Sequence, residues 1–296
     1  MNGFRLDKRQ VRAAFEAAAA RYDEVAVLQR EIAQRILERL ELIKLQPQRI
    51  LDIGAGTGLA TQALGQRYRQ ARVIALDLAH GMLQQARRRG GLMQRLFDRR
   101  DFVCADAEHL PFADHSIDLI FSSATLQWCS DLDHTFAEFR RILAPGGLLM
   151  FSTFGPDTLK ELRQSWQAAD AAAQDEATHV HPFIDMHDIG DALLRAGLAD
   201  PVMDVEHFTL TYSDAYQLMR ELKTLGAHNV ASDRRHSLTG KTRVQNMLAA
   251  YETFRVDGLL PASYEVVYGH AWAAGISKNE IAVDPPVNVL NPGVRR

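Results

Sequence analysis

The 296-residue sequence has only two cysteines, Cys104 and Cys129, which are too few for a disulfide framework or a zinc site of four thiolates. It has no apolar run long enough to span a membrane, and no apolar segment typical of a signal peptide follows its first residues. It also lacks a charge excess, because 34 Lys and Arg face 37 Asp and Glu, so bulk binding of nucleic acid is disfavoured. We therefore expect a cytoplasmic protein that binds neither membranes nor nucleic acid.

Several signatures of catalysis and of metal binding are missing as well. The chain has no Gly-x-Ser-x-Gly nucleophile elbow and no P-loop pattern. His179, His181 and His187 lie close together in the sequence, but no acidic or thiol ligand shares their spacing. We expect no metal site, and we expect the two cysteines to fill small spaces in the core.

The order of the apolar segments predicts an α/β fold. Short, nearly continuous apolar runs alternate with amphipathic helical stretches, which is typical of a parallel sheet covered on both faces. The expected strands are 49–53, 72–76, 102–105, 117–121 and 148–151, and the expected helices between them are 59–69, 81–89 and 132–143. The fold class is therefore a doubly wound sheet.

The segments on either side of this pattern predict further parts. Residues 11–45 have helical periodicity, and so do 158–173 and 186–196. Two alternating runs, 207–212 and 264–268, read as strands, with a helical stretch between them that is far longer than a hairpin loop needs. The predicted division is an N-terminal helical cap at 1–45, a domain at 46–275 with helical lid insertions around 155–185 and 213–260, and a flexible tail at 276–296.

A glycine-rich turn joins the first expected strand to its helix. In the segment LDIGAGTG, Gly54, Gly56 and Gly58 allow the backbone to turn sharply and let a ligand lie against bare amides. Leu59 stands where a dinucleotide-binding Gly-x-Gly-x-x-Gly motif has its third glycine, which disfavours a nicotinamide oxidoreductase. A turn without any ligand is the alternative.

Two further acidic residues stand at successive strand ends. A carboxylate at Asp77 suits both hydroxyls of a ribose, although it suits equally a cap for the following helix. Asp106 would face an adenine amino group, with the Ala107 amide as a donor to a ring nitrogen, unless the segment is an ordinary Asx turn. Together with Asp52 before the glycine turn, these residues predict a nucleotide-like cofactor.

With these features the chain resembles the class I S-adenosylmethionine-dependent methyltransferases. The resemblance covers about residues 45–155 and implies S-adenosyl-L-methionine as the cofactor, in a seven-stranded sheet whose last strand runs antiparallel. Carried over by position, Asp52 and the Gly54 backbone orient the methionine amino group, and Met82 packs on the adenine. The remaining cofactor-binding positions that the resemblance implies are Ala55, Gly56, Gly58, Asp77, Leu78, Asp106, Ala107 and Ser122.

Four separated blocks resemble a narrower family, the malonyl-[acyl-carrier protein] O-methyltransferases of biotin biosynthesis. These blocks are 15–29, 125–128, 154–162 and 222–229. The resemblance implies N-terminal helices that close over the cofactor and a lid above the acceptor. It also implies methylation of the free carboxylate of a malonyl thioester, on acyl-carrier protein or coenzyme A, to a methyl ester that primes pimeloyl synthesis.

Three residues are candidates for contact with the methyl acceptor. Tyr22 would hold the carboxylate through its hydroxyl, Gln127 would donate a hydrogen bond, and Trp128 would form an apolar wall. Packing alone explains them equally well, because Tyr22 shares an apolar stripe with Phe15 and Trp128 is a typical core residue. In that alternative Gln127 is simply exposed.

Cations are needed to bind an anionic acceptor and an acidic carrier. Arg234, Arg235, Lys241 and Arg243 are unranked candidates for pairing with the carboxylate. A docking patch for acyl-carrier protein is proposed at Arg87, Arg88 and Arg89, in an arginine-rich stretch that extends to Arg100, although such runs are more often solvated helix faces.

Other functions stay open at this stage. A methyltransferase for a free small acid such as trans-aconitate, or for a quinone-like molecule, would share the cofactor residues. The segment after the fourth strand lacks the Asp/Asn-Pro-Pro-aromatic motif of amide and base methylation, which disfavours nucleic-acid substrates. A non-enzymatic binding module that retains the fold is a third possibility.

Overall fold

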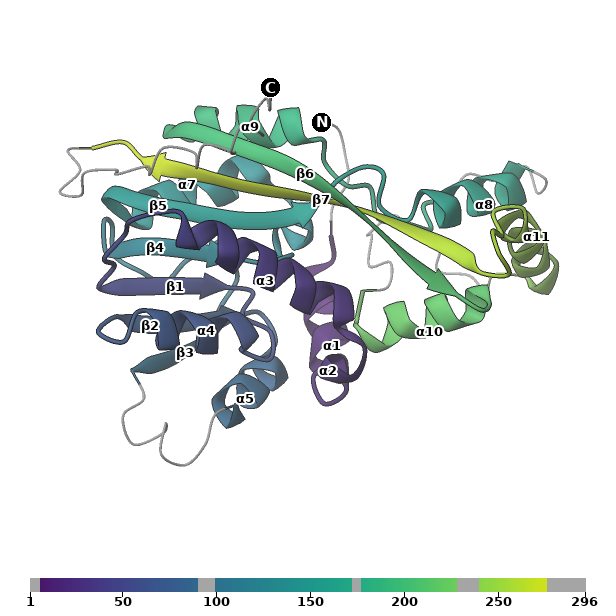
Figure 1. The fold of residues 1–296 in the computed structure, drawn as a ribbon, viewed down its shortest axis with the longest axis horizontal. Coiled ribbons are helices and arrows are strands. Elements are labelled where there is room, and N and C mark those ends of the chain that lie inside the picture. Colours follow the sequence, from purple (N-terminus) through teal and green to yellow (C-terminus); the bar gives the residue numbers. More distant parts are fainter. Residues whose placement is uncertain (1–5, 90–98, 172–176, 228–239, 276–296) are drawn as a thin grey trace, which may run out of the picture.

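The computed structural model describes residues 6–89, 99–171, 177–227 and 240–275, and one seven-stranded sheet runs through them (Figure 1). The strand order is β3-β2-β1-β4-β5-β7-β6, with β1 to β5 parallel and β7 antiparallel to both of its neighbours. The strands are β1 (Arg49–Ile53), β2 (Arg72–Asp77), β3 (Arg100–Cys104), β4 (Ile117–Ser122), β5 (Leu143–Phe154), β6 (Leu198–Tyr212) and β7 (Leu260–Ala273). The predicted fold class is confirmed, including the antiparallel last strand.

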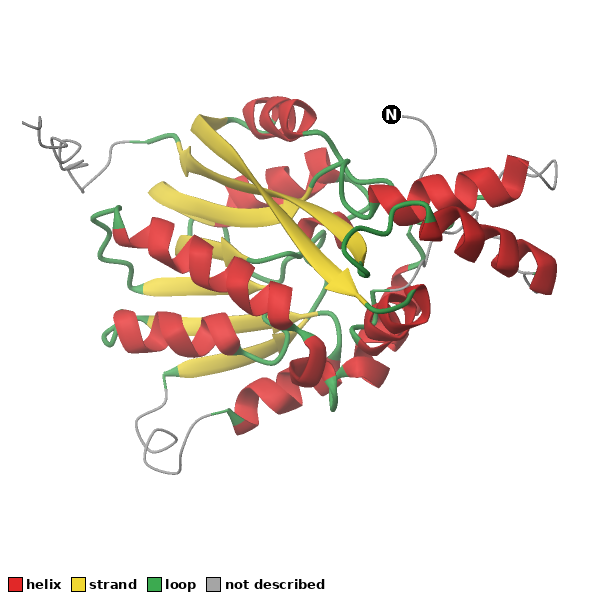
Figure 2. Ribbon diagram, turned by 45° about the vertical axis from the view of Figure 1, so that its right-hand side comes forward, coloured by secondary structure: helices red, strands yellow, loops and turns green. Residues whose placement is uncertain are grey.

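Helices cover both faces of the sheet (Figure 2). The helices are α1 (Lys8–Ala18), α2 (Tyr22–Val25), α3 (Val27–Glu41), α4 (Leu59–Arg67), α5 (His80–Arg88), α7 (Leu132–Ile142), α8 (Lys160–Ala171), α9 (Met186–Arg195), α10 (Ala215–Thr224) and α11 (Lys241–Glu252), with a 3₁₀ turn η1 (Leu126–Trp128). In Figure 1, α3 and α4 lie in front of the sheet, and α7 and α9 lie behind it. None of the helices in the described ranges is both long and apolar enough to cross a membrane.

The helical segment before β1 is divided more finely than its periodicity predicts. A single run was expected over 11–45, but the chain forms α1, the short α2 and α3. The Asp7 carboxylate begins α1 by accepting hydrogen bonds from the backbone N–H groups of Arg9 and Gln10. The turn around α2 is held by tertiary contacts described below, which apolar spacing does not encode.

Strands β6 and β7 are much longer than their sequence patterns predict. They contain 15 and 14 residues and continue past the rest of the sheet as a twisted ribbon (Figure 1). Beyond the sheet the ribbon meets α8, α10 and α11, and α8 packs against α11 (Figure 2). We call α8, α10, α11 and the adjoining end of the ribbon the arm. The buried Glu161 of α8 accepts hydrogen bonds from the Ser263 backbone N–H and hydroxyl, and thereby links α8 to β7.

The predicted insertions and tail can be compared with these elements. Helices are present in both expected insertion regions, as α8 and as α10 with α11. The stretch 276–296, expected to be a flexible tail, lies outside the described residues. The boundaries of cap, domain and lids stay a prediction.

Helix α3 is held to the sheet by one apolar face. Ile32, Ile36 and Leu40 recur at a spacing of four residues, are fully buried, and pack in one core cluster with Ile50 of β1 and Met150 of β5. Because protein interiors are close-packed, removing one of these side chains leaves a cavity that the neighbours only partly fill.

Two leucines near the end of this helix offer a matched test. Leu40→Ala is expected to lower the free energy of unfolding by about 2–5 kcal/mol, because its side chain is fully buried. Leu42→Ala, at a side chain that is 78% exposed, is expected to change it by less than about 0.5 kcal/mol. Urea denaturation measures both, and equal losses would contradict this packing of α3.

Candidate functional site

The glycine turn after β1 requires glycine for steric reasons. Gly54 and Gly56 have φ angles of +69° and +53°, which side chains rarely adopt. The N–H groups of Gly54 and Ala55 both donate to the Leu76 carbonyl of β2, at 2.8 and 3.0 Å. A Cβ on Gly54 would lie 2.0 Å from the Thr125 hydroxyl oxygen. The turn is therefore pressed between β2 and the segment after β4.

Gly58 has a different role from the other two glycines. Its φ angle is +83°, and a Cβ there would lie 2.7 Å from the Cβ of Ala86 in α5. It begins α4 at close contact with α5 and is not among the residues that line the cavities described below. The structure thus gives this predicted site residue a packing role.

Asp52 and Asp77 are buried carboxyl groups at the ends of two adjacent strands. Asp52 accepts a hydrogen bond from the Thr61 hydroxyl at 2.5 Å. Asp77 accepts from the backbone N–H groups of Gly56 and Ala79 at 2.9 and 2.8 Å, so it does cap the turn into α5. Burial raises the pKa of Asp52 to about 7 and that of Asp77 to about 6.

The third acid, Asp106, is tied to the N-terminal helix. It accepts from the Glu108 backbone N–H at 3.1 Å, as in an Asx turn, and from the Lys8 ammonium at 2.9 Å. Lys8 also pairs with Glu108. Helix α1 is therefore bound directly over the turn that follows β3, a contact that the sequence analysis did not foresee.

Two small cavities lie beside these acids at the carboxyl ends of the strands. The Asp77 cavity has a volume of about 90 Å³, and the Asp52 cavity has a volume of about 70 Å³. The predicted residues in the first are Tyr22, Gly54, Gly56, Asp77, Leu78, Met82, Asp106, Ala107 and Trp128, and those in the second are Tyr22, Asp52, Gly54, Ala55 and Gly56. Ser122 lines neither, because it is fully buried at the end of β4, and Ser123 lines both instead.

A larger pocket of about 470 Å³ lies on the side of the arm, and we call it the apolar pocket. Its walls are mainly aromatic and aliphatic, contributed by the cap, η1, β5, α8, the segment after it, α10 and β7. The main apolar residues are Phe15, Trp128, Phe154, Leu159, Leu162, Trp166, Val180, Phe183, Met219, Leu222, Leu225 and Tyr264. Among the described residues no aspartate or glutamate lines it, and its ionisable side chains are Tyr22, His179, His181, Lys223 and Tyr264.

Tyr22 and Ala124 stand where the three spaces meet, because both residues line the Asp77 cavity, the Asp52 cavity and the apolar pocket. The backbone of Ala124 has a φ angle of +49°, unusual for a residue with a Cβ. Its N–H group donates to the Ser152 carbonyl at 3.1 Å, and its carbonyl accepts from the Gln127 side-chain amide at 2.6 Å. This strained position had no signal in the sequence.

Gln127 and Trp128 of η1, both predicted to contact the methyl acceptor, make different contacts. Gln127 is buried rather than exposed, and its amide oxygen accepts from the Thr153 hydroxyl at 3.2 Å. It lines the apolar pocket, but its polar groups hold Ala124 and β5. Trp128 forms a wall between the pocket and the Asp77 cavity, with its ring 5.2 Å from Phe15 in an edge contact.

The ionisable groups around this junction are poor proton acceptors. Burial, with the nearby Asp77 carboxylate, raises the pKa of Tyr22, so its hydroxyl remains a donor. Burial lowers the pKa of His181 in the apolar pocket to about 4. Burial also raises the pKa of the Cys129 thiol to about 12 and keeps it protonated.

Helix α2 is attached to the glycine turn through Asp23. The Thr57 hydroxyl donates to one Asp23 oxygen at 2.6 Å, and Arg89 pairs with the other while its Nε donates to the Thr57 carbonyl. Helix α1 adds a further contact, because the Gly81 N–H of α5 donates to the Glu16 carboxylate at 2.9 Å. These contacts hold the N-terminal helices over both small cavities.

Two of the three clustered histidines, His179 and His181, line the apolar pocket, but the three have different partners. His179 stacks on Trp166 with ring centroids 4.0 Å apart and lies 3.0 Å from Asp170, whereas the exposed His187 pairs with Asp185. Together with His181 in the pocket wall, they do not form a common ligand set.

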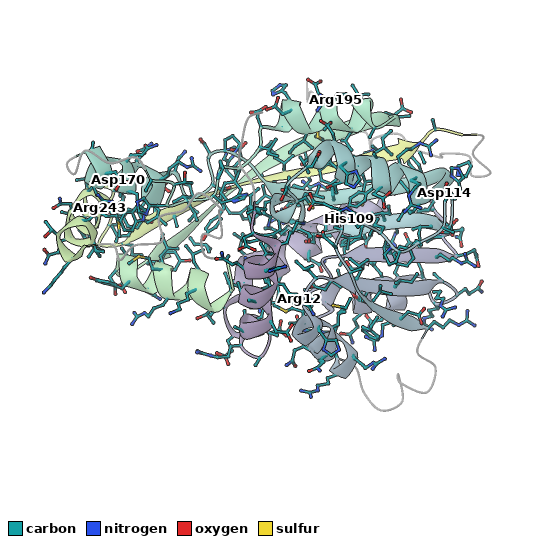
Figure 3. The ribbon with its side chains drawn as sticks, turned by 180° about the vertical axis from the view of Figure 1, so that it is seen from behind. Arg12, His109, Asp114, Asp170, Arg195 and Arg243 are labelled. Carbon is teal, nitrogen blue, oxygen red and sulfur yellow. The ribbon has the colours of Figure 1, made fainter. Side chains whose placement is uncertain are left out.

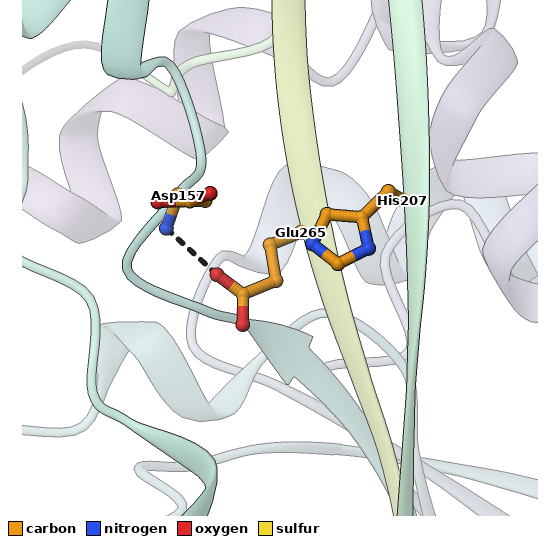
Figure 4. Close-up of side chains that lie close together, drawn as sticks. All are labelled: Asp157, His207 and Glu265. Carbon is orange, nitrogen blue, oxygen red and sulfur yellow. Dashed lines mark hydrogen bonds between the residues drawn. The ribbon is translucent and has the colours of Figure 1, made fainter.

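A different group of possible metal ligands comes from β6, β7 and the segment between β5 and α8 (Figure 4). Ligand atoms of Asp157, His207 and Glu265 lie within 4.8 Å of one another. Glu265 already accepts from the Asp157 backbone N–H at 2.7 Å, and the Asp157 carboxylate pairs with Lys160 at 3.0 Å. These contacts give both carboxylates a structural role.

The candidate cations are dispersed. Arg234 and Arg235 lie outside the described residues, and Lys241 begins α11. Arg243 lies 3.4 Å from the buried Asp170 on the projecting arm, where Figure 3 labels both residues. Among the described residues, the lysine or arginine that lines the apolar pocket is Lys223, which the sequence analysis did not select.

Comparisons with known proteins agree with this geometry. The family described as "Methyltransferase domain" matches residues 51–151. A malonyl-[acyl-carrier protein] O-methyltransferase of Methylovorus sp. (strain MP688) is 56% identical, over 92% of this chain and 90% of its own. The protein of the same name from Gallionella capsiferriformans (strain ES-2) is 53% identical, over 92% and 93%.

Solved structures show the same fold at low identity. A Bacillus halodurans C-125 protein assigned to the methyltransferases aligns with a TM-score of 0.58 at 16% identity, covering 82% of this chain and 99% of its own. The YcgJ protein of Bacillus subtilis aligns with a TM-score of 0.57 at 16% identity, covering 82% and 98%. At this identity the likeness establishes the arrangement of the sheet and its helices.

The raised pKa of Asp52 predicts a pH dependence of stability. A carboxyl group whose pKa rises from 3.8 to about 7 on folding takes up protons on folding, so its contribution to stability falls as pH rises through this range. Asp52→Asn removes this cost. We expect its stabilising effect, relative to the wild type, to be greater at about pH 8 than at about pH 5, by on the order of 2–4 kcal/mol.

Denaturation curves of the ligand-free protein at both pH values measure this difference. Asp133→Asn is the matched control, because its side chain is 58% exposed and its pairing with Arg195 lies on the surface. A difference for Asp52→Asn that is no larger than for the control would contradict the burial of an unpaired carboxyl group.

Proposed function

Because the chain belongs to the family of malonyl-[acyl-carrier protein] O-methyltransferases, we propose that it transfers a methyl group from S-adenosyl-L-methionine to the free carboxylate of a malonyl thioester. The observation that carries this proposal is the meeting of two acid-lined cavities and one apolar pocket at Tyr22 and Ala124. A donor on one side and an acceptor on the other would face each other at this point.

The residues around the small cavities fit this cofactor. Asp77 uses its carboxylate for two backbone donors and keeps lone pairs for ribose hydroxyls. The raised pKa of Asp52 marks a buried carboxyl group that a cationic ammonium would stabilise in its ionised form. Leu78 and Met82 supply apolar walls for the adenine. Bound there, the cofactor supplies an electrophilic methyl group on its sulfonium.

The adenine end of the site is closed by the cap. Asp106 and Ala107 line the Asp77 cavity as proposed, and the Lys8 ammonium beside Asp106 anchors α1 over them. An adenine amino group would therefore share the Asp106 carboxylate with Lys8. Exclusion of water by α1 would strengthen each of these polar contacts.

A carboxylate acceptor suits the chemistry of the junction. A carboxylate is ionised at neutral pH, so its oxygen attacks the methyl carbon without the loss of a proton, and the carbon–sulfur bond breaks as the new bond forms. On the side of the apolar pocket, Tyr22 has a raised pKa and His181 a lowered one, so neither side chain suits the role of a base. The contribution of the chain is to align the reactants and exclude water.

The apolar pocket suits a thioester-linked acceptor better than a small free acid. Its volume of about 470 Å³ offers room for an acyl group together with part of its prosthetic arm. Methylation removes the charge of the malonyl group, so that enzymes with apolar acyl tunnels accept the ester as a primer for pimeloyl synthesis. On the same premise we propose that the chain acts in the cytoplasm, in biotin synthesis.

The direct test is incubation with S-adenosyl-L-methionine labelled in its methyl group and malonyl-acyl-carrier protein. We expect the carrier to gain one labelled, base-labile methyl ester, detected by intact-protein mass spectrometry. Parallel reactions with malonyl-coenzyme A, trans-aconitate and a quinone-like phenol compare the alternatives. Methylation of one of these small molecules in preference to both malonyl thioesters would overturn the proposed acceptor.

Only two of the three arginines predicted as a docking patch for the carrier line the same groove. Arg89 points to Asp23 and Thr57, whereas Arg87 and Arg88 line a basic groove of about 1040 Å³. Arg49, Arg72 and Arg100 also line this groove, at the first residues of their strands. The groove is therefore at the opposite end of the parallel strands from the cofactor, and we propose that it attracts an acidic carrier at long range.

Reversal of two charges tests this steering role. Arg87→Glu/Arg88→Glu is expected to raise the KM for malonyl-acyl-carrier protein several-fold at low ionic strength, with a smaller effect at high ionic strength because salt screens the attraction. Calorimetric affinity for S-adenosylhomocysteine is the internal control and should not change. A KM equal to that of the wild type at low ionic strength would contradict the proposed steering role of the groove.

A further inference from the structure

Among the described residues one lysine lines the apolar pocket, and its side chain is exposed. Of the described residues that line it, Lys223 is the only lysine or arginine, and no aspartate or glutamate lines it. Lys8 and Lys160 pair with carboxylates elsewhere, whereas Lys223 has no ion pair with any part of the chain that the structure describes.

The position of Lys223 on its helix directs it toward the pocket. Met219, Leu222 and Lys223 are spaced three and four residues apart on α10, so they share one helical face, and all three line the pocket. A lysine in the last turn also suits the helix dipole. The dipole favours any position in that turn, however, and does not explain a lysine on the apolar, pocket-lining face.

The end of α10 lies against the cap. A Cβ on Gly226, just after the helix, would lie 3.0 Å from the Ala14 carbonyl oxygen of α1, and α10 also contacts α2. Tyr22, which stands at the junction of the three spaces, belongs to α2. Lys223 thus belongs to the part of the pocket wall that is next to the cap.

We propose that Lys223 is the anion-binding residue of the acceptor pocket. Its ammonium would pair with an anionic oxygen group of the acceptor, either the malonyl carboxylate or the phosphate of the prosthetic arm. This inference rests on the function proposed above. Transfer of a carboxylate or a phosphate into an apolar pocket is costly unless a cation accompanies it. Lysine suits this role, because its compact charge lies on a flexible stem.

The charge of Lys223 does not change during methyl transfer, and its ammonium takes no part in bond formation. If it pairs with the carboxylate, one carboxylate oxygen faces the ammonium, and the other forms the new bond to the methyl carbon. The electron pair of the broken carbon–sulfur bond stays on sulfur, whose positive charge is lost, and the ammonium keeps its three protons. The neutral ester no longer pairs with Lys223, which favours its release.

Three variants test the proposal with two substrates. Lys223→Met keeps a long, flexible side chain without the charge, Lys223→Arg keeps the charge, and Lys44→Met removes an exposed lysine between α3 and β1 that is not among the pocket residues. The substrates are malonyl-acyl-carrier protein and the malonyl thioester of N-acetylcysteamine, which has no phosphate. Steady-state kinetics with S-adenosyl-L-methionine separates KM from kcat.

For Lys223→Met we expect KM to rise about tenfold or more, with kcat changed by less than about threefold. Lys223→Arg should restore most of the affinity, and Lys44→Met should match the wild type. A rise with both substrates assigns the carboxylate as the partner, and a rise with the carrier substrate alone assigns the phosphate. An unchanged KM with both substrates would overturn the proposal.

A binding measurement separates this proposal from the proposed function. With S-adenosylhomocysteine present, malonate and phosphopantetheine are titrated by calorimetry into the wild type and Lys223→Met. Weaker binding of either anion by the variant supports the role of Lys223, even if no malonyl thioester is methylated. If Lys223→Met also loses affinity for S-adenosylhomocysteine and Lys223→Arg does not restore it, the side chain acts through the fold and the proposal is wrong.

Discussion

The structure is organised around two carboxyl groups that are buried without a cationic partner in the described part of the chain. Parallel pairing of β1 with β2 brings Asp52 and Asp77 to the same edge of the sheet, where burial opposes their ionisation. A fold gains nothing in stability from such an arrangement. Its use is to bind a ligand that supplies a positive charge and hydroxyl groups. The glycine turn between these acids follows from the same need, because it brings backbone amides close without side chains.

The N-terminal helices complete this site, to which the helices and the sheet contribute different groups. The sheet supplies the acids, and the helices close over them through Lys8, Glu16 and Asp23, each of which contacts a different segment of the site. Tyr22 lies between these contacts, at the point where all three spaces meet. Alignment of two reactants therefore depends on tertiary contacts of the helices as much as on the sheet.

Local patterns were sufficient for the sheet and for most of the acid-lined site. Apolar runs located the strands, and glycine and aspartate at strand ends located the cavities, because each signal reflects a local steric or chemical need. The patterns failed where tertiary contact decides. Nothing local indicates that Ala124 takes a positive φ angle, that Gln127 turns inward to hold it, or that Ser123 rather than Ser122 reaches the cavity. The full lengths of β6 and β7 likewise depend on the arm that they support.

Strand β7 is part of both the central sheet and the arm. One part pairs with β5, where Ser152 and Thr153 are opposite Tyr268 and Val267, and its other part carries the arm beside the apolar pocket. Because the strand is continuous, an insertion between these parts would shift the register of one part relative to the other. The tip of the ribbon is free of this constraint, so new acceptor specificities can evolve there, by lengthening or exchanging the helices of the arm, while the machinery for the methyl donor is inherited unchanged.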